Sequence, residues 1–271
     1  VTLMDEDYNP GLISDFVLEH PEYTWVSKDG KRFLRGALCY GYPEVVDYRL
    51  EQLKEVLEYE IDGMYLCTRS HAKFANESKD LDDFGYNDPV VTEFKNRYGK
   101  NILTEDFDRE KWYQVQRSLF TDFIRKAERL IRKKSIPLWL GIHSDEYTMM
   151  NISPMGHMYL DWGTWLKDDL IDGLIIAAGE AVLDKHHVWF KGVAAKYSSV
   201  IEAGKELLCW FRLWDWRNDQ PYFPAPVETK NPDLMKKVIQ EYRKSFSGFA
   251  FHEAINIEYH NLWEMFKNVL Q

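Results

Sequence analysis

Residues 137–146 read PLWLGIHSDE, an apolar run of strand length that ends in a histidine, a serine and two acids. Continuous apolar strands of this kind are typical of parallel sheets, in which both faces of the strand are covered. The polar residues begin where the apolar run stops. This stretch therefore predicts a buried parallel strand whose carboxyl end carries polar side chains.

The same pattern recurs along the chain, with amphipathic segments between the apolar runs. Strands that alternate with helices predict an α/β fold, and we interpret this one as a (β/α)8 barrel of the TIM type. In such barrels the functional residues gather at the carboxyl ends of the strands. Six runs end in polar, acidic or aromatic residues: Val1–Asp7, Asp62–His71, Pro137–Glu146, Asp172–Glu180, Glu206–Trp216 and Gly248–Ala254.

The 271 residues fit one barrel domain, residues 1–271, with an inserted loop at about residues 72–108. Six strand–helix units are two short of a closed barrel. Either this chain lacks the first one or two units, or Tyr23–Val26 and Phe33–Tyr40 complete the sheet. The Asp29-Gly30 step between these stretches is a hairpin signal, so we favour the first alternative.

Apolar periodicity predicts the helices that separate the strands. Pro43 and Glu44 mark the start of the first, and Gly99 ends a short one within the polar stretch Asp82–Asp108, which we expect to stay out of the core and to shape the mouth of a site. The expected helical ranges are 48–59, 89–98, 109–134, 161–170, 191–204, 233–246 and 261–270.

Composition narrows the partners. A net charge of −10 argues against nucleic acid and anionic membranes, and no run approaches the roughly 20 apolar residues of a membrane helix. Cys39, Cys67 and Cys209 have no metal or redox spacing and are expected as reduced core residues. Glycine-rich nucleotide motifs and a serine elbow are absent from the sequence, so no cofactor is expected. The oligomeric state is not predicted.

Acidic residues follow most of the expected strands. Glycoside hydrolysis needs two carboxyl groups across the scissile bond, one acting as acid and the other as nucleophile or base, and acids around one barrel mouth can supply the pair. Asp5, Glu6 and Asp7 follow the first run. The candidate catalytic residues follow the later runs: Asp145, Glu146, Glu180, Asp215 and Glu253.

Other strand-end residues have the chemistry to bind a sugar. Arg69, His71, His143 and Arg212 can orient a carboxylate or bind hydroxyl groups. Trp214 and Trp216 either stack on a pyranose face or pack beneath a loop, and the sequence leaves both open.

A metal site has less support. His143 with Asp145, or the adjacent pair His186 and His187, does not complete a coordination motif in the sequence, so no metal ligand is assigned.

Five stretches resemble the bacterial glycoside hydrolase-like barrels, a family-10-like group of polysaccharide-acting proteins that includes lipoproteins. The resemblance implies a TIM barrel in which Val1–Asp7 is about the third strand, a carbohydrate substrate, and a secreted, periplasmic or lipoprotein-anchored location. The matching stretches are Tyr42–Val45, Asp62–Leu66, Phe84–Gly99, Phe107–Trp112 and Asp161–Ile176.

One strand departs from that pattern. Many such barrels end the strand after Asp-Gly in an acid, whereas Cys67, Thr68 and Arg69 occupy this position here. The leading hypothesis is a glycoside hydrolase that takes its carboxylates from later strands. The alternatives are a non-catalytic glycan-binding barrel and, with less support, a metal-dependent hydrolase or deacetylase.

Overall fold

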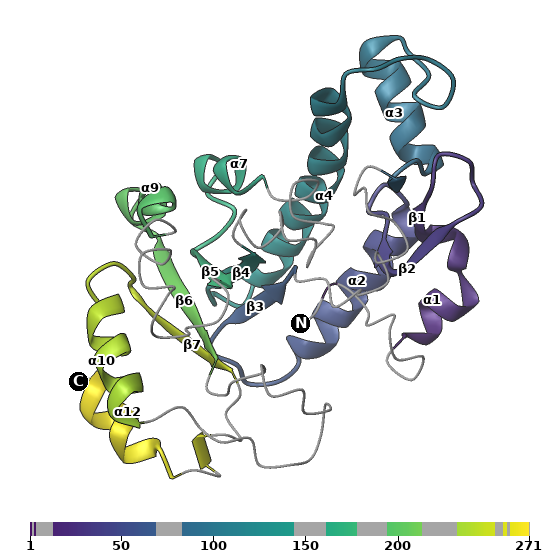
Figure 1. The fold of residues 1–271 in the computed structure, drawn as a ribbon. Helices are drawn as coiled ribbons and strands as arrows, with labels where there is room; N and C mark the ends of the chain where they lie inside the picture. Colours follow the sequence, from purple (N-terminus) through teal and green to yellow (C-terminus); the bar gives the residue numbers. More distant parts are fainter. Residues whose placement is uncertain are drawn as a thin grey trace. The chain divides into compact units, whose positions relative to one another are not determined.

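The computed structural model describes residues 1, 3, 13–68, 83–143, 161–177, 194–212, 232–252, 257–258 and 261–270. Figure 1 labels the helices and strands along the chain. The chain divides into two compact units, Val1–Asp172 and Gly173–Gln271. Predictions that fall on other residues lie outside the described part of the chain.

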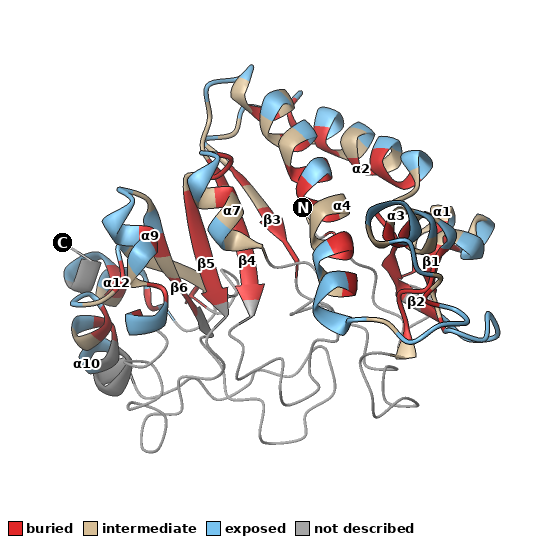
Figure 2. Cartoon of the chain, turned by 90° about the horizontal axis from the view of Figure 1, so that it is seen from above, coloured by how far each residue is buried: buried red, intermediate tan, exposed pale blue. Residues whose placement is uncertain are grey.

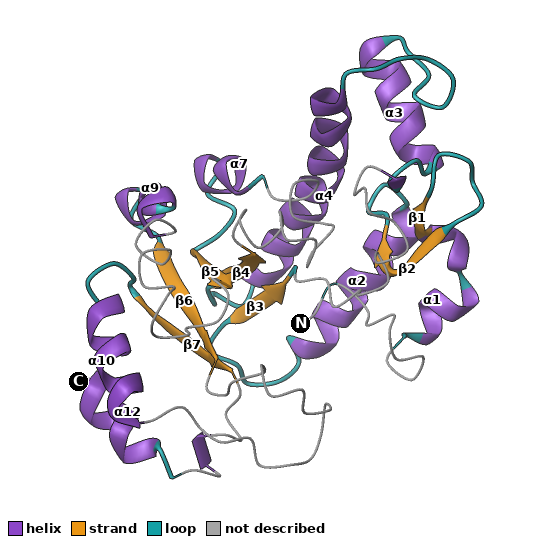
Figure 3. Ribbon diagram, viewed as in Figure 1, coloured by secondary structure: helices purple, strands orange, loops and turns teal. Residues whose placement is uncertain are grey.

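The main sheet is parallel and has five strands, drawn in orange in Figure 3: β3 (Met64–Cys67), β4 (Leu138–His143), β5 (Gly173–Ala177), β6 (Glu206–Arg212) and β7 (Gly248–His252). Their order in the sheet follows the chain, without the reversal that marks the switch point of a doubly wound sheet. The predicted α/β class is therefore confirmed. Closure into an eight-stranded barrel stays a prediction.

The start of the chain lies beside β3 with the hydrogen bonds of a parallel ladder. Cys67 donates its N–H to the Val1 carbonyl at 2.8 Å, and Leu3 donates its N–H to the Cys67 carbonyl at 3.0 Å. Leu3 is buried. The six expected apolar runs thus all contribute described residues in strand-like positions.

A separate hairpin follows. Strands β1 (Thr24–Val26) and β2 (Phe33–Leu38) pair antiparallel in a sheet of their own. Gly30 adopts φ +71° in the turn between them, a conformation that glycine tolerates without strain. The alternative in which these stretches complete the parallel sheet is therefore wrong, because the Asp-Gly turn folds them onto each other.

Seven α-helices of the described residues overlap the expected ranges, whereas the helix at Asp15–Glu19 was not expected. Gly99 ends its helix in the left-handed conformation at φ +71°, and Asp108 caps the next helix by accepting hydrogen bonds from the N–H groups of Glu110 and Lys111. The α-helices are α1 (Asp15–Glu19), α2 (Pro43–Val56), α3 (Asp88–Tyr98), α4 (Arg109–Arg132), α7 (Trp162–Lys167), α9 (Ser198–Glu202), α10 (Pro232–Tyr242) and α12 (Trp263–Leu270), with a 3₁₀ turn η2 at Pro21–Tyr23.

Helix α4 presents one buried face, as its periodicity predicts. Trp112, Phe120 and Phe123 are buried on it, while the other side carries exposed and half-buried residues (Figure 2). The polar stretch that precedes α4 is more buried than expected, because Val90, Phe94 and Ile102 also leave the solvent. The expectation that Asp82–Asp108 stays out of the core was wrong, because aromatic residues of this segment pack against Trp112 of α4.

Candidate functional site

Each of the predicted acids follows the carboxyl end of a described strand in the sequence. In the second unit, Ile176 of β5 pairs with Cys209 of β6, and Arg212 of β6 pairs with His252 of β7, all in parallel register. Parallel strands end at the same edge of a sheet. Glu180, Asp215 and Glu253 each follow one of these ends within three residues, although their own positions lie outside the described residues.

The first unit repeats the arrangement with two strands. Leu66 pairs with Leu140 and Cys67 with Gly141, so β3 and β4 also end together. The remaining candidates follow these ends or that of β6. His143 and Arg212 are the last residues of β4 and β6, and their side chains are not described. Outside the described residues lie Arg69, His71, Asp145, Glu146, Trp214 and Trp216, as well as His186 and His187.

The end of β3 is occupied by a structural contact. Thr68 is buried, its hydroxyl donates to the Gly141 carbonyl at 2.6 Å, and its N–H donates to the same oxygen at 3.1 Å. The departure from the acidic pattern at this strand is thus matched by a threonine that ties β3 to β4.

Near the same end, Tyr65 lies against the backbone of β4. A Cβ atom placed on Gly141 would lie 2.2 Å from the Tyr65 hydroxyl oxygen, so only a glycine leaves room for the ring. Tyr65 is half-buried, whereas Leu66 and Leu140, on the opposite face of the sheet, are buried. Nothing local in the sequence links Tyr65 to Gly141, so this contact was not predicted.

Hydrogen bonds tie neighbouring segments together at the amino ends of the strands. The Asp172 carboxylate accepts the Leu138 N–H at 2.7 Å and pairs with Arg132 at 3.1 Å, and the Asp172 N–H donates to the Leu138 carbonyl at 2.8 Å. In the second unit, the Leu207 N–H donates to the Ser247 hydroxyl at 3.1 Å, and the Ser247 N–H donates to the Leu207 carbonyl at 2.8 Å. Asp and Ser serve structure at this edge.

The cysteines are buried and unpaired, as predicted. Burial raises the pKa of the Cys39 thiol to about 12 and also raises that of Cys209, so neither is poised as a nucleophile. Within the described residues, no group of three metal-ligating side chains comes together. In the same residues, no helix has both the length and the apolar character to cross a membrane.

The comparisons with known proteins bear on the fold. Neither the protein-family models nor the curated proteins gave a match. The glycoside hydrolase domain of PgaB (BpsB) from Bordetella bronchiseptica superposes with a TM-score of 0.64 at 12% identity, covering 99% of this chain and 73% of that one. The chain therefore has a glycoside hydrolase-like fold, and at this identity the likeness shows the fold alone.

Two more distant structures are also of glycan-active enzymes. The glycoside hydrolase domain of PelA from Pseudomonas aeruginosa gives a TM-score of 0.47 at 12% identity, covering 94% of this chain and 78% of that one. A chitinase from Chromobacterium violaceum gives 0.39 at 10% identity, covering 94% of each chain. These two are too dissimilar to support further conclusions.

Proposed function

We propose that this chain is a glycoside hydrolase that cleaves O-glycosidic bonds of a poly- or oligosaccharide at the carboxyl ends of its parallel strands. One observation carries the proposal. Strands β4, β5, β6 and β7 follow one another in the sheet, and within three residues of each carboxyl end the chain supplies at least one acid. This is the edge at which barrel enzymes hold their catalytic residues.

The chemistry requires two of these carboxyl groups in different roles. One, with its pKa raised by burial, protonates the leaving oxygen, while the other acts as nucleophile or as base toward water. A separation of about 5 Å between them would give retention, and about 6.5–9.5 Å would give inversion. The candidates are Asp145, Glu146, Glu180, Asp215 and Glu253.

The polar and aromatic residues at the same strand ends would hold the sugar. Arg69, His71, His143 and Arg212 supply hydrogen-bond donors for hydroxyl groups, and charged donors make the stronger bonds. Trp214 and Trp216 supply indole faces for a pyranose ring. The glycoside hydrolase-like fold agrees with this assignment without deciding the substrate or the pair of acids.

The test is reducing-sugar release from a panel of polysaccharides and aryl glycosides by the wild type and by five amide variants, Asp145→Asn, Glu146→Gln, Glu180→Gln, Asp215→Asn and Glu253→Gln. We expect two variants to lose about 10²–10⁴-fold in kcat, the usual contribution of acid–base groups, with unchanged unfolding midpoints. Glu202→Gln, an exposed position on α9, is the control and keeps full activity. Full activity in all five amide variants would rule the proposal out.

The buried Thr68 favours a second candidate, a non-catalytic glycan-binding barrel. Its hydroxyl is committed to the Gly141 carbonyl, in the strand where the resembling barrels carry an acid. This candidate predicts that some glycan of the panel raises the melting temperature while no substrate is turned over. Turnover that depends on one of the five carboxylates would exclude it.

A further inference from the structure

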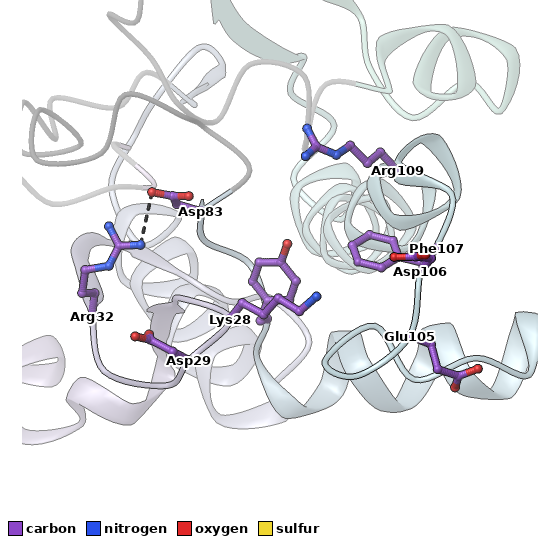
Figure 4. A pocket seen from close by; sticks show the side chains of 9 residues that line it. Lys28, Asp29, Arg32, Asp83, Glu105, Asp106, Phe107 and Arg109 are labelled. Carbon is purple, nitrogen blue, oxygen red and sulfur yellow. Dashed lines mark hydrogen bonds and ion pairs between the residues drawn. The ribbon is translucent and has the colours of Figure 1, made fainter.

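A cleft of about 570 Å³ is lined only by residues of the first unit (Figure 4). The turn of the β1–β2 hairpin forms one wall with Lys28 and Arg32, and the segment that leads into α4 forms the other with Phe107 and Arg109. Tyr86 and Asp83 also line it. The volume lies in the range of small-molecule sites, about 300–1,000 Å³.

The hairpin is fastened to the segment that carries Tyr86. The N–H groups of Gly85 and Tyr86 both donate to the Val26 carbonyl, at 3.0 and 3.1 Å. The buried Asn87 adds two bonds, because its amide donates to the Thr24 carbonyl at 2.8 Å and accepts the Val26 N–H at 3.3 Å. The cleft is therefore preformed, which lowers the entropic cost of binding.

An aromatic cluster holds two of the lining residues in place. The Tyr86 ring stacks on Trp112 with centroids 4.8 Å apart, and Phe107 meets Trp112 edge-on at 5.8 Å. Trp112 is buried and its indole N–H donates to the Gly85 carbonyl at 3.3 Å. Phe107 is half-buried, so part of its ring remains available to a ligand.

Charges of both signs surround these rings. Arg32 pairs with Asp83 at 3.1 Å, and the Lys28 ammonium lies 5.6 Å from the centre of the Phe107 ring. Figure 4 shows Lys28 extending between that ion pair and Phe107. Across the lining, three cationic side chains face four anionic ones. A phosphate or uronate would meet the acids, and a polyamine would meet the cations, so this balance favours a ligand without net charge.

Both walls lie on connections that leave carboxyl ends of the parallel sheet. The hairpin follows the Val1–Leu3 segment, which runs parallel to β3, and Asp83–Arg109 follows β3 itself. Connections of this kind form the ligand-binding face of α/β barrels. The cleft therefore lies between two connections of this kind.

We infer that this cleft is a binding subsite for uncharged sugar units of a polysaccharide chain. The inference rests on the proposed function for the identity of the polymer. Charged and hydrogen-bonding side chains beside an aromatic surface can recognise a sugar, which alternates hydroxyl groups with apolar C–H faces. Lys28, Arg109 and Asp83 bind hydroxyl or acetamido groups, and Phe107 packs against the C–H face of a sugar ring.

The experiment measures equilibrium affinity of the full chain for hexasaccharides. The neutral probes are cellohexaose, maltohexaose, mannohexaose and N-acetylated chitohexaose, and the charged probes are hexagalacturonate and a fully deacetylated glucosamine hexamer. We expect at least one neutral hexasaccharide to bind and Lys28→Ala to weaken it about tenfold, the effect of removing a charged hydrogen-bond donor. Phe107→Leu, which keeps an apolar side chain in the wall of the cleft, weakens the binding of this hexasaccharide similarly.

Lys31→Ala is the matched control, since Lys31 is an exposed lysine of the same turn that does not line the cleft, and its variant keeps the wild-type affinity. Absence of binding to every neutral probe, binding of the charged probes alone, or equal affinity in Lys28→Ala and Phe107→Leu to that of the wild type overturns the inference.

Aryl-glycoside hydrolysis by the wild type separates the two claims. Lack of hydrolysis together with binding that depends on Lys28 contradicts the proposed function and supports the subsite. Hydrolysis together with hexasaccharide binding that is unchanged in Lys28→Ala and Phe107→Leu supports the proposed function and contradicts the subsite.

Discussion

Asp172 and Asp215 are two aspartates at opposite ends of strands of the parallel sheet. Asp172 directly precedes β5, and its carboxylate is occupied by the Leu138 N–H and by Arg132. Asp215 follows the carboxyl end of β6 in the sequence and is one of the proposed catalytic acids. The contrast shows an aspartate that holds strands in place at their amino ends, whereas the proposed function places its chemistry at their carboxyl ends.

The largest expected effect concerns the buried thiols of Cys39 and Cys209. Burial raises the pKa of the Cys39 thiol from its ordinary value of 9.0 to about 12, and it also raises the pKa of Cys209. Raised acid pKa values mean stability that is fully present below pH 9 and is lost as the pH rises toward 12. Each thiol should lower the free energy of unfolding by about 1.4 kcal/mol per pH unit in that range.

Urea unfolding at pH 8, 9, 10 and 11 measures this loss. Cys39→Ala is the control, because removing one thiol should make the decline shallower. The same slope in both proteins would show that this thiol is not closed off from water.

The next effect tests the amino edge directly. Asp172→Ala removes the acceptor of the Leu138 N–H and one partner of Arg132, so we expect about 2–3 kcal/mol less unfolding free energy. The ion pair is partly exposed and adds little of this, so the lost hydrogen bond dominates. Asp62→Ala, at an exposed acid just before β3, should stay within about 0.5 kcal/mol of wild type. Equal losses in the two variants would break the comparison.

A smaller loss is expected near the carboxyl edge. Gly141→Ala places a Cβ 2.2 Å from the Tyr65 hydroxyl oxygen and 2.5 Å from its ring, so the ring must shift at a cost of about 1–3 kcal/mol. Gly163→Ala in α7 meets nothing within 4 Å and should be neutral or slightly stabilising. A double-mutant cycle with Tyr65→Ala checks the cause, because the loss at Gly141 should shrink once the ring is gone. Additive losses would mean that another group resists the Cβ.

The smallest effect is expected at a buried polar side chain of helix α4. Gln116 on α4 is buried, and in the described part of the chain neither of its amide atoms has a hydrogen-bond partner. Gln116→Met keeps the shape and removes the buried polar atoms, so the unfolding free energy should rise by about 1 kcal/mol. Gln114→Met, at an exposed site on the same helix, should give no such gain. A destabilised Gln116→Met variant would reveal a structural role for this amide.

Local signals in the sequence were enough to predict the strands and most helix ends. Pro43 and Gly99 act on neighbouring residues of the chain, and each marks the helix boundary that the structure has. The apolar runs similarly predicted the strands, because a strand covered on both faces has to be apolar throughout.

Contacts between distant residues were beyond such signals. The bond of Asp172 to Leu138 and the fit of Tyr65 over Gly141 depend on which strands become neighbours. The cleft was missed for the same reason, since Lys28 and Phe107 meet through the folding of two separate connections. The burial of Phe94 was missed because its polar neighbours outweigh it in any average over the segment.

The most direct test of the account compares the two edges in one experiment. Activity per folded molecule and unfolding free energy are measured together for Asp172→Asn and for the five strand-end amide variants. We predict that Asp172→Asn loses stability but keeps kcat, whereas two of the strand-end variants keep stability and lose kcat about 10²–10⁴-fold. Loss of kcat in Asp172→Asn with full activity in all five strand-end variants would contradict the assignment of chemistry to the carboxyl ends.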